Sequence, residues 1–244
     1  MTEATRNWLT SLEVPGKPDE YETKRLLADF GLAVPAALRV PARMSGGQAP
    51  VAPGFDGPYV VKVRSAEILH KTDGGGVRLG VDFSSLPAAV DGMLWRFAGC
   101  GALVEEQVLF ESLEFIVGAF RDPAFGPAVM AGAGGILTEL YKDVAFRLVP
   151  CSQREALRML KELAVFPALE GFRGFVMDPA GLAELVAKVS AIVEDFGDVF
   201  SQLDINPLVF TPRGWTILDA KLILASGSTQ QPSFIATGTT GGSP

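Results

Sequence analysis

The stretch from residue 59 to residue 80 most narrows what this chain can fold into. A β-rich run, YVVKV, carries Lys62 near its end, and a second β-rich run, VRLGV, follows a short loop. The loop holds the only histidine of the chain, His70, and three consecutive glycines, Gly74 to Gly76. Glycine N–H groups can point into an anion, and a nearby lysine supplies a point charge. We therefore expect two strands joined by a phosphate-binding loop, with phosphoryl chemistry at His70.

Charge and hydropathy exclude several classes of protein. The formal net charge is −7 without a basic stripe, which argues against nucleic acid or an anionic membrane as the main partner. The sequence lacks 18 consecutive apolar residues, and its first 17 residues lack the apolar core of a signal peptide. Cys100 and Cys151 have no metal-type spacing. We expect a cytoplasmic protein with reduced thiols.

Periodicity and turn residues divide the chain into helices, strands and loops. Helices are predicted over 19–30, 86–98, 152–163 and 179–195. Strands are predicted over 102–109 and 113–120, as a possible hairpin, and over 127–131, 202–210 and 215–224. Residues 1–17 read as a loose arm, 45–58 as a loop and the tail from 226 as disordered. Without regular βα alternation, the pattern favours an α+β fold of two subdomains over a doubly wound sheet.

The last two predicted strands form a hairpin with four polar residues, Asp204, Asn206, Asp219 and Lys221. If the turn consists of residues 212–213, opposed residue numbers sum to 425, so Asn206 faces Asp219 and Asp204 faces Lys221. All four then share one face, where carboxylate and amide oxygens suit Mg²⁺. A three-residue turn with a bulge would separate Asn206 from Asp219. A surface salt bridge between Asp204 and Lys221 is the simpler alternative.

Two further segments are less specific. Residues 104–114 place acidic and amide groups beside an apolar strand, where they can hydrogen-bond adenine and ribose, although a solvated strand has the same pattern. The GAGG at 132–135 is not a dinucleotide-binding fingerprint, because G-x-G-x-x-G is incomplete, and by itself it is typical of a tight turn. The sequence has no P-loop motif.

Together these segments resemble the ATP-grasp β subunit, or β-like half, of ADP-forming acyl-CoA synthetases. The resemblance spans residues 19–224 and is carried by DEYETKRLLADFGLAVP, YVVKV, LHKTDGGGVRLG, LVEEQV, RDPAFGPAVMAGAGGILTELYKDVAFRLVP, GFRGF and LDINPLVF…LDAK. It implies an ATP-grasp fold, in which two α+β subdomains clasp a nucleotide. The subdomains would be 19–103, with the glycine-rich loop, and 104–225, with the metal site. An N-terminal arm (1–18) and a disordered tail (226–244) would flank them.

The resemblance also implies roles for individual residues. Lys62 would contact the nucleotide phosphates, His70 would accept or relay the phosphoryl group, and Arg147 would help to receive a phosphohistidine beside the 132–135 loop. The glycine loop over the phosphates would be Gly74 and Gly75, and the hinge that reads adenine would be Glu105, Glu106, Gln107 and Val108. Glu114 would be the ribose-binding acid, and Asn206 and Asp219 would be the magnesium ligands.

The implied reaction is acyl-CoA + ADP + Pi ⇌ carboxylic acid + ATP + CoA, with ATP or ADP and Mg²⁺ as cofactors. A CoA-binding α subunit that carries the main phosphohistidine would be the partner. One alternative is a nucleotide-sensing regulatory module, against which the intact Lys62, His70, Asn206 and Asp219 argue. Another is a self-sufficient ATP-grasp carboxylate–amine ligase, which would not need the histidine loop.

Overall fold

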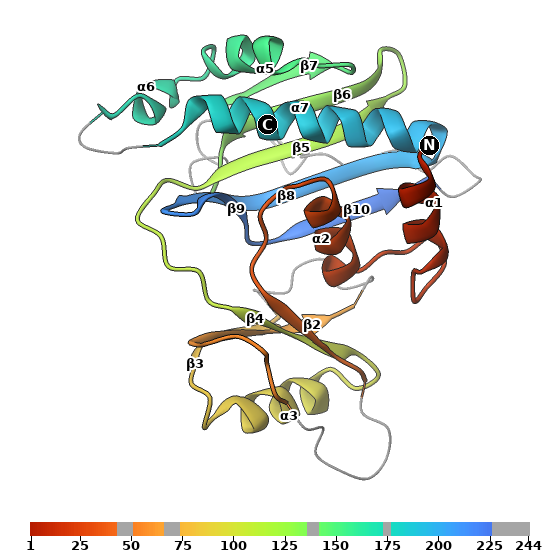
Figure 1. The fold of residues 1–244 in the computed structure, drawn as a ribbon, viewed down its shortest axis with the longest axis vertical. Coiled ribbons are helices and arrows are strands. Elements are labelled where there is room, and N and C mark those ends of the chain that lie inside the picture. Colours follow the sequence, from red (N-terminus) through yellow and green to blue (C-terminus); the bar gives the residue numbers. More distant parts are fainter. Residues whose placement is uncertain (43–50, 66–73, 136–141, 173–176, 226–244) are drawn as a thin grey trace, which may run out of the picture.

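The computed structural model describes residues 1–42, 51–65, 74–135, 142–172 and 177–225, and within them the fold is α+β, as predicted. Two antiparallel sheets lie one above the other in Figure 1. The smaller sheet has the strand order β1-β4-β2-β3 and carries helix α3 on one face. Its elements are β1 Ala37–Val40, β2 Tyr59–Arg64, β3 Val77–Val81, α3 Leu86–Arg96 and β4 Gly101–Glu106.

The larger sheet has the order β10-β8-β5-β6-β7, and β9 also pairs with the long strand β8. Its strands are β5 Phe115–Asp122, β6 Gly126–Ala133, β7 Val144–Leu148, β8 Phe200–Thr211, β9 Gly214–Ile217 and β10 Ala220–Leu224. The helices that follow β7 are α5 Gln153–Leu160, α6 Phe166–Leu169 and α7 Pro179–Phe196. Helix α7 runs across the sheet and covers one face of it (Figure 1).

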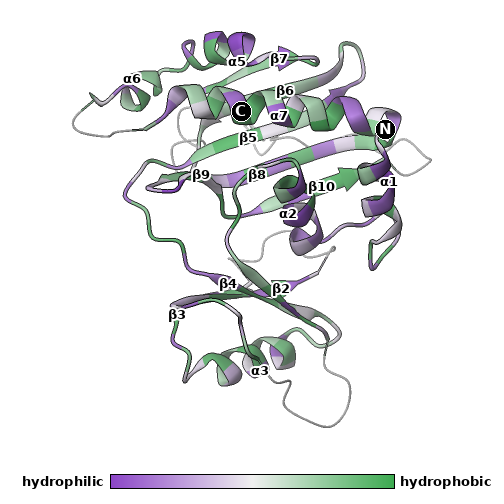
Figure 2. Ribbon diagram, in the orientation of Figure 1, coloured by the Kyte–Doolittle hydropathy of each residue, from purple (hydrophilic) through white to green (hydrophobic). Residues whose placement is uncertain are grey.

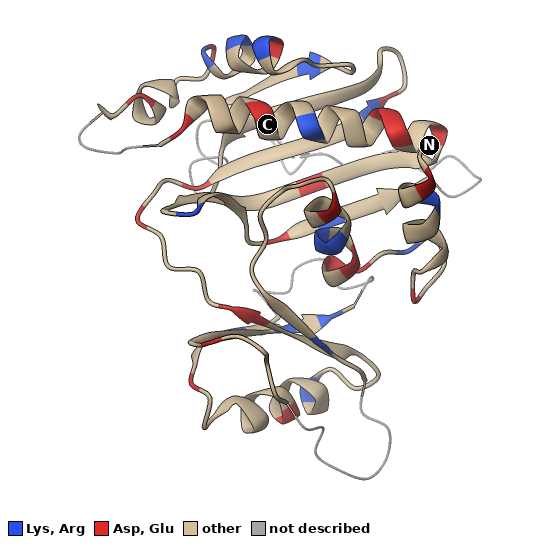
Figure 3. Ribbon diagram, in the orientation of Figure 1, with Lys and Arg blue, Asp and Glu red and all other residues tan. Residues whose placement is uncertain are grey.

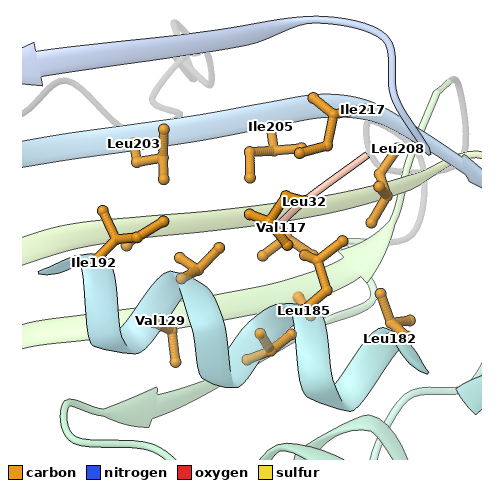
Figure 4. Packing of buried hydrophobic residues seen from close by; sticks show 14 of the residues in the cluster. Leu32, Val117, Val129, Leu182, Leu185, Ile192, Leu203, Ile205, Leu208 and Ile217 are labelled. Carbon is orange, nitrogen blue, oxygen red and sulfur yellow. The ribbon is translucent and has the colours of Figure 1, made fainter. Parts of the chain in front are cut away.

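Helix α7 packs its apolar side chains against the larger sheet and buries one face of it. It begins at the cap Asp178, whose carboxylate accepts from the N–H of Gly181, and it ends at Gly197, which has a φ of 56°. Green and purple segments alternate along α7 in Figure 2, as expected of an amphipathic helix. Its buried residues meet those of the strands in one core (Figure 4): Val117, Val129, Leu182, Leu185, Ile192, Leu203, Ile205 and Leu208.

Helix α2 (Glu20–Asp29) forms where the sequence predicts a helix. Asp19 and Glu22 make a reciprocal capping box at its start, and Gly31, with a φ of 74°, follows its end. The helix packs against β10, and its residues Leu26 and Leu27 belong to the core of the larger sheet. The predicted boundaries group this helix with the smaller subdomain, whereas its apolar packing is with the larger one.

The predicted hairpin of residues 102–109 with 113–120 is wrong. Strands β4 and β5 lie in different sheets, and residues 107–114 connect the two (Figure 1). An apolar run has the same sequence pattern whichever strand it pairs with, so the partner could not be deduced from the pattern. None of the helices that the structure describes is long and apolar enough to cross a membrane.

The N-terminal arm is not loose within residues 1–18. Helix α1 (Glu3–Thr10) starts at the cap Thr2 and lies against the C-terminal end of α7. The ring of Trp8 meets that of Phe196 edge-on at 5.9 Å, and its indole N–H donates to the carbonyl oxygen of Glu22 at 3.0 Å. The single aromatic anchor in a polar segment is the signal that the sequence prediction did not use.

Trp8→Ala should therefore destabilise the chain by about 3–5 kcal/mol, because a buried aromatic ring and its hydrogen bond are lost. Urea denaturation followed by circular dichroism measures the change. Trp95→Ala is the matched control, since Trp95 is 79% exposed; it should shift the free energy of unfolding by no more than about 0.5 kcal/mol. Equal, small effects of both variants would mean that the N-terminal helix contributes nothing to the fold.

Candidate functional site

Lys62 lies on β2 at the centre of a ring of charged groups between the two sheets. Its ammonium nitrogen is 2.6 Å from Oε1 of Glu20, 2.8 Å from Oε2 of Glu105 and 2.8 Å from the carbonyl oxygen of Leu218. A second lysine, Lys24 of α2, contacts the same three residues at 2.8, 2.7 and 2.5 Å. The ring joins α2 and the β9–β10 connection to two strands of the smaller sheet.

The ring is buried and electrically balanced. The exposed fractions of Glu20, Lys24, Lys62 and Glu105 are all 7% or less. Burial of the Lys62 ammonium opposes its charged form, but the carboxylates of Glu20, Glu105 and Asp219 outweigh this and hold its pKa well above the usual value. Lys62 therefore remains a cation. Figure 3 shows the mixed charges of α2 beside the smaller sheet.

Arg64, two residues along β2, extends the charged contacts. It lies 2.6 Å from Oδ2 of Asp19, the cap of α2, and 2.5 Å from Oε2 of Glu13. Burial opposes the charged form of this guanidinium, but the two carboxylates raise its pKa. The start of α2 is thus held against β2 at two successive positions of the same strand face.

The hairpin of β8 with β9 and β10 has the predicted register. Thr211 pairs with Gly214 across a two-residue turn, and Asp204 pairs with Lys221, so paired numbers sum to 425. The backbone N–H of Asn206 donates to the carbonyl oxygen of Asp219 at 3.1 Å. The three-residue turn is therefore excluded, and Asn206 faces Asp219.

These polar residues lie on the face of the larger sheet that α7 does not cover. Asp204 alternates with Leu203 and Ile205, which point toward α7 (Figure 4). Its neighbours across the sheet are Gly118 on β5 and Lys221 on β10. One face of the sheet thus belongs to the core, and the other presents polar groups next to the lysine ring.

Asp204 is the electrostatically strained member of the hairpin. Its Oδ1 atom is buried and has no hydrogen-bond partner among the described residues. Burial, with a further contribution from the Asp219 carboxylate, raises the pKa of Asp204 to about 6, although Lys221 opposes the shift. Two carboxylates held close together, one with an orphan oxygen, are an arrangement that a cation would relieve.

The hairpin fits a magnesium ion that shares its coordination with a nucleotide. Asn206 and Asp219 offer two hard oxygen ligands, which is the number that Mg²⁺ takes from protein when phosphates supply the rest. The described residues contain no group of three or more histidine, cysteine or acidic side chains that could hold a metal without such help. Asn206 and Asp219 would hold the ion, and its charge would offset that of the phosphates.

The predicted adenine hinge, residues 105–108, lies where the chain passes from the smaller to the larger sheet. The carboxylate of Glu105 is occupied by Lys24 and Lys62, so its side chain is not available to adenine. Glu106 pairs with Arg213 at 2.8 Å. Gln107 accepts from the N–H of Gly80 at 2.6 Å, and Val108 is half-buried. The adenine-binding role of residues 105–108 stays a prediction.

Glu114, the predicted ribose-binding acid, lies beside the glycines that follow β6. Its carbonyl oxygen accepts from the N–H of Gly134 at 2.7 Å, and a Cβ on Gly135 would be 2.7 Å from its Oε2 atom. Gly135 has a φ of 60°, so a larger residue there would be both strained and crowded. Gly134 and Gly135 therefore form a close-packed turn against Glu114, whereas Gly132 and Ala133 are the last residues of β6.

The glycine-rich loop is described only from Gly74 onward. Gly74 and Gly75 form an exposed turn, and Gly75 has a φ of 68° with the guanidinium of Arg96 about 3.0 Å from where its Cβ would be. His70 lies outside the described residues, so its predicted role stays a prediction.

The structure does not bring Arg147 to the hairpin. Arg147 pairs across β7 and β6 with Val129, which faces α7, so it lies on the helix-covered face of the sheet (Figure 4). Its guanidinium forms a bidentate contact with Glu162, which follows α5 and raises the pKa of Arg147.

Glu20 and Lys24 are the site residues that the sequence prediction missed. Their four-residue separation is the ordinary spacing of a pair on a helix surface. A pair of this kind gives no sign of burial when it is read from the sequence. The stronger signal is Lys62 itself, since a lysine in a fully buried strand requires carboxylate partners.

Comparison with known proteins shows the family to which this chain belongs. Residues 15–224 match the family model of the ATP-grasp domain, so the chain belongs to the ATP-grasp family. It is a homologue of the β subunits of ADP-forming acetate–CoA ligases: it is 32% identical over 219 residues to the β subunit of ligase I of Pyrococcus furiosus, covering 84% of this chain and 90% of that one. Ligase I of Archaeoglobus fulgidus is 37% identical over 175 residues, and the match covers 68% of this chain but only 25% of that protein.

Solved structures agree with this assignment. A structure of acetyl-coenzyme A synthetase 1 of Candidatus Korarchaeum cryptofilum with coenzyme A and Ca-AMPCP has a TM-score of 0.74 and 29% identity, over 85% of this chain and 93% of that one. Another holds Mg-AMPPCP, with its phosphohistidine segment pointing towards the nucleotide-binding site, and has a TM-score of 0.69 and 29% identity over 84% and 92% of the two chains.

The unpaired carboxylate leads to a stability prediction. Asp204→Asn should stabilise the metal-free chain at pH 7 by roughly 1–3 kcal/mol, because it removes a negative charge that adjoins Asp219 and has one buried oxygen, Oδ1, without a hydrogen-bond partner among the described residues. Thermal unfolding in the presence of a chelator measures the change. Asp198→Asn is the control, since the Asp198 side chain is fully exposed and far from this pair. A loss of stability in Asp204→Asn would contradict the electrostatic strain inferred here.

Proposed function

We propose that this chain binds MgATP or MgADP between its two sheets, as the nucleotide-binding part of an ADP-forming acyl-CoA synthetase. The observation that carries the proposal is the placement of a buried lysine cation on β2 next to the Asn206–Asp219 hairpin. Residues from two separate sheets thus converge on one place. An ammonium and a hard-oxygen metal site together are suited to a polyphosphate.

In this proposal the chain mainly positions and neutralises the phosphates. Lys62 contacts phosphate oxygens, Asn206 and Asp219 hold Mg²⁺, and Gly74 and Gly75 present backbone N–H groups. Residues 106–108 border the adenine, and Glu114 binds the ribose. Bound Mg²⁺ supplies charge neutralisation to the transferring phosphoryl group.

The proposed partner is a CoA-binding α subunit with the main phosphohistidine. Support comes from two relatives that are themselves named β subunits; the match to this chain covers 90% of the length of each. The whole reaction interconverts acyl-CoA, ADP and phosphate with the carboxylic acid, ATP and CoA. His70 accepts the phosphoryl group or relays it, and the loop at 132–135 borders the path to the partner. Arg147 could contribute to this path only from the opposite face of the sheet, so we propose no catalytic step for it.

Calorimetric titration of the purified chain with ATP, with and without Mg²⁺, tests the nucleotide site. We expect magnesium-dependent binding, and Asp219→Asn should weaken it by about tenfold or more because one metal ligand loses its charge. Asp198→Asn, at an exposed side chain that precedes β8 and does not belong to the proposed metal site, should bind like the unmodified chain. Failure of the unmodified chain to bind MgATP would refute the proposed function.

The histidine relay has its own test. His70→Asn should leave MgATP binding within a few fold, because an asparagine removes the nucleophilic ring nitrogen without adding charge. Phosphoryl exchange with the α partner, followed with labelled ATP, should be abolished. Normal exchange in this variant would exclude a relay through His70 while leaving the nucleotide site intact.

A further inference from the structure

The two lysines of the ring share one set of acceptors. An ammonium group has three N–H donors and no acceptor. Lys62 directs its three donors to Glu20, Glu105 and Leu218. Lys24 directs its three donors to the same three residues. Both ammonium groups are therefore fully used, and each acceptor residue is held twice.

This double occupancy bears on how Lys62 can meet a phosphate. A phosphate oxygen can enter its coordination only if Lys62 releases at least one of the three present partners. A buried carboxylate left without a cation is costly. Because Lys24 contacts the same residues, the group that Lys62 releases still has a hydrogen-bonded cation beside it. The cost of releasing Lys62 is lowered by the second lysine.

We propose that Lys24 and Glu20 are positioning residues for Lys62: Lys24 frees it to bind phosphate, and Glu20 restrains it. Neither residue needs to touch the nucleotide. Both act through the contacts of the Lys62 ammonium at the edge of the hairpin that carries Asp219. This inference rests on the proposed function, since it concerns the affinity of the same site for a nucleotide.

Charge balance predicts opposite effects for the two residues. With Lys24→Met, Lys62 is the remaining one of the two described lysines that contact both Glu20 and Glu105, and it is held more tightly. With Glu20→Gln, the two lysines share the carboxylate of Glu105, and Lys62 is held less tightly. A purely structural role predicts the same direction for both variants, because each breaks a buried hydrogen-bonded contact.

The experiment is calorimetric titration of the whole chain with MgATP and, separately, with adenosine. Lys24→Met should weaken MgATP binding by about tenfold, and Glu20→Gln should strengthen it by about threefold. The double variant Lys24→Met/Glu20→Gln restores neutrality and should bind MgATP within about threefold of the unmodified chain. Adenosine, which lacks phosphates, should bind all of them equally. Lys188→Met is the control for loss of a positive charge: Lys188 is half-buried on α7, pairs with Glu184 and donates to the carbonyl oxygen of Gly31, away from the ring.

Several results would overturn the inference. These are unchanged MgATP affinity in Lys24→Met, weaker affinity in Glu20→Gln, or a double variant that binds no better than Lys24→Met. If Lys24→Met alone does not fold, the other two variants decide, since the double variant keeps a neutral Lys62–Glu105 pair. Absence of MgATP binding by the unmodified chain would instead refute the proposed function, and the positioning role with it.

Discussion

Two buried lysines held by the same two carboxylates and one carbonyl oxygen connect the halves of this chain. Burying four charges costs several kcal/mol per ion before any pairing, so the arrangement persists only because the charges cancel and the ammonium donors are all used. The contacts also set geometry. They fix α2 against β2 and β4 and bring the backbone at Leu218 beside Lys62. The position of the hairpin that carries Asn206 and Asp219 relative to the smaller sheet depends on this ring.

The larger sheet divides structural from functional roles by strand alternation. The face toward α7 holds the apolar core, and the opposite face holds Asp204 and its neighbours. Arg147 and Asp204 belong to one sheet, yet they lie on opposite faces, because successive residues of a strand point to opposite sides. Arg147 pairs with Val129, which faces α7, whereas Asp204 pairs with Gly118 on the other face. A carboxylate with one buried oxygen that has no partner among the described residues, placed beside a second carboxylate, does not stabilise a fold. Its presence on the open face is understandable if the site is completed by a cation.

Much of the local structure could be predicted from the sequence. The start of α2, the strand that carries Lys62 and the pairing of Asn206 with Asp219 follow from capping residues, β-rich composition and turn length. These features depend on neighbours within a few residues or across a short turn. Predictions that needed distant partners were less successful. The run at 102–109 was paired with its neighbour in sequence, whereas β4 pairs with β1 and β2.

The sequence by itself determined helices α2, α3, α5 and α7, the strands around the glycine-rich loop, the register of the terminal hairpin and the family to which the chain belongs, but not α1, β1 or β7. Tertiary structure alone decided that the carboxylate of Glu105 pairs with two lysines, that Arg147 pairs with Glu162, and that α1 is packed. The physical reason is the length of chain between partners. Lys62 and Glu20 are 42 residues apart, and Lys24 and Leu218 are 194 apart. Spacing in the sequence carries no information on such contacts, because folding brings these groups together only when both sheets have formed.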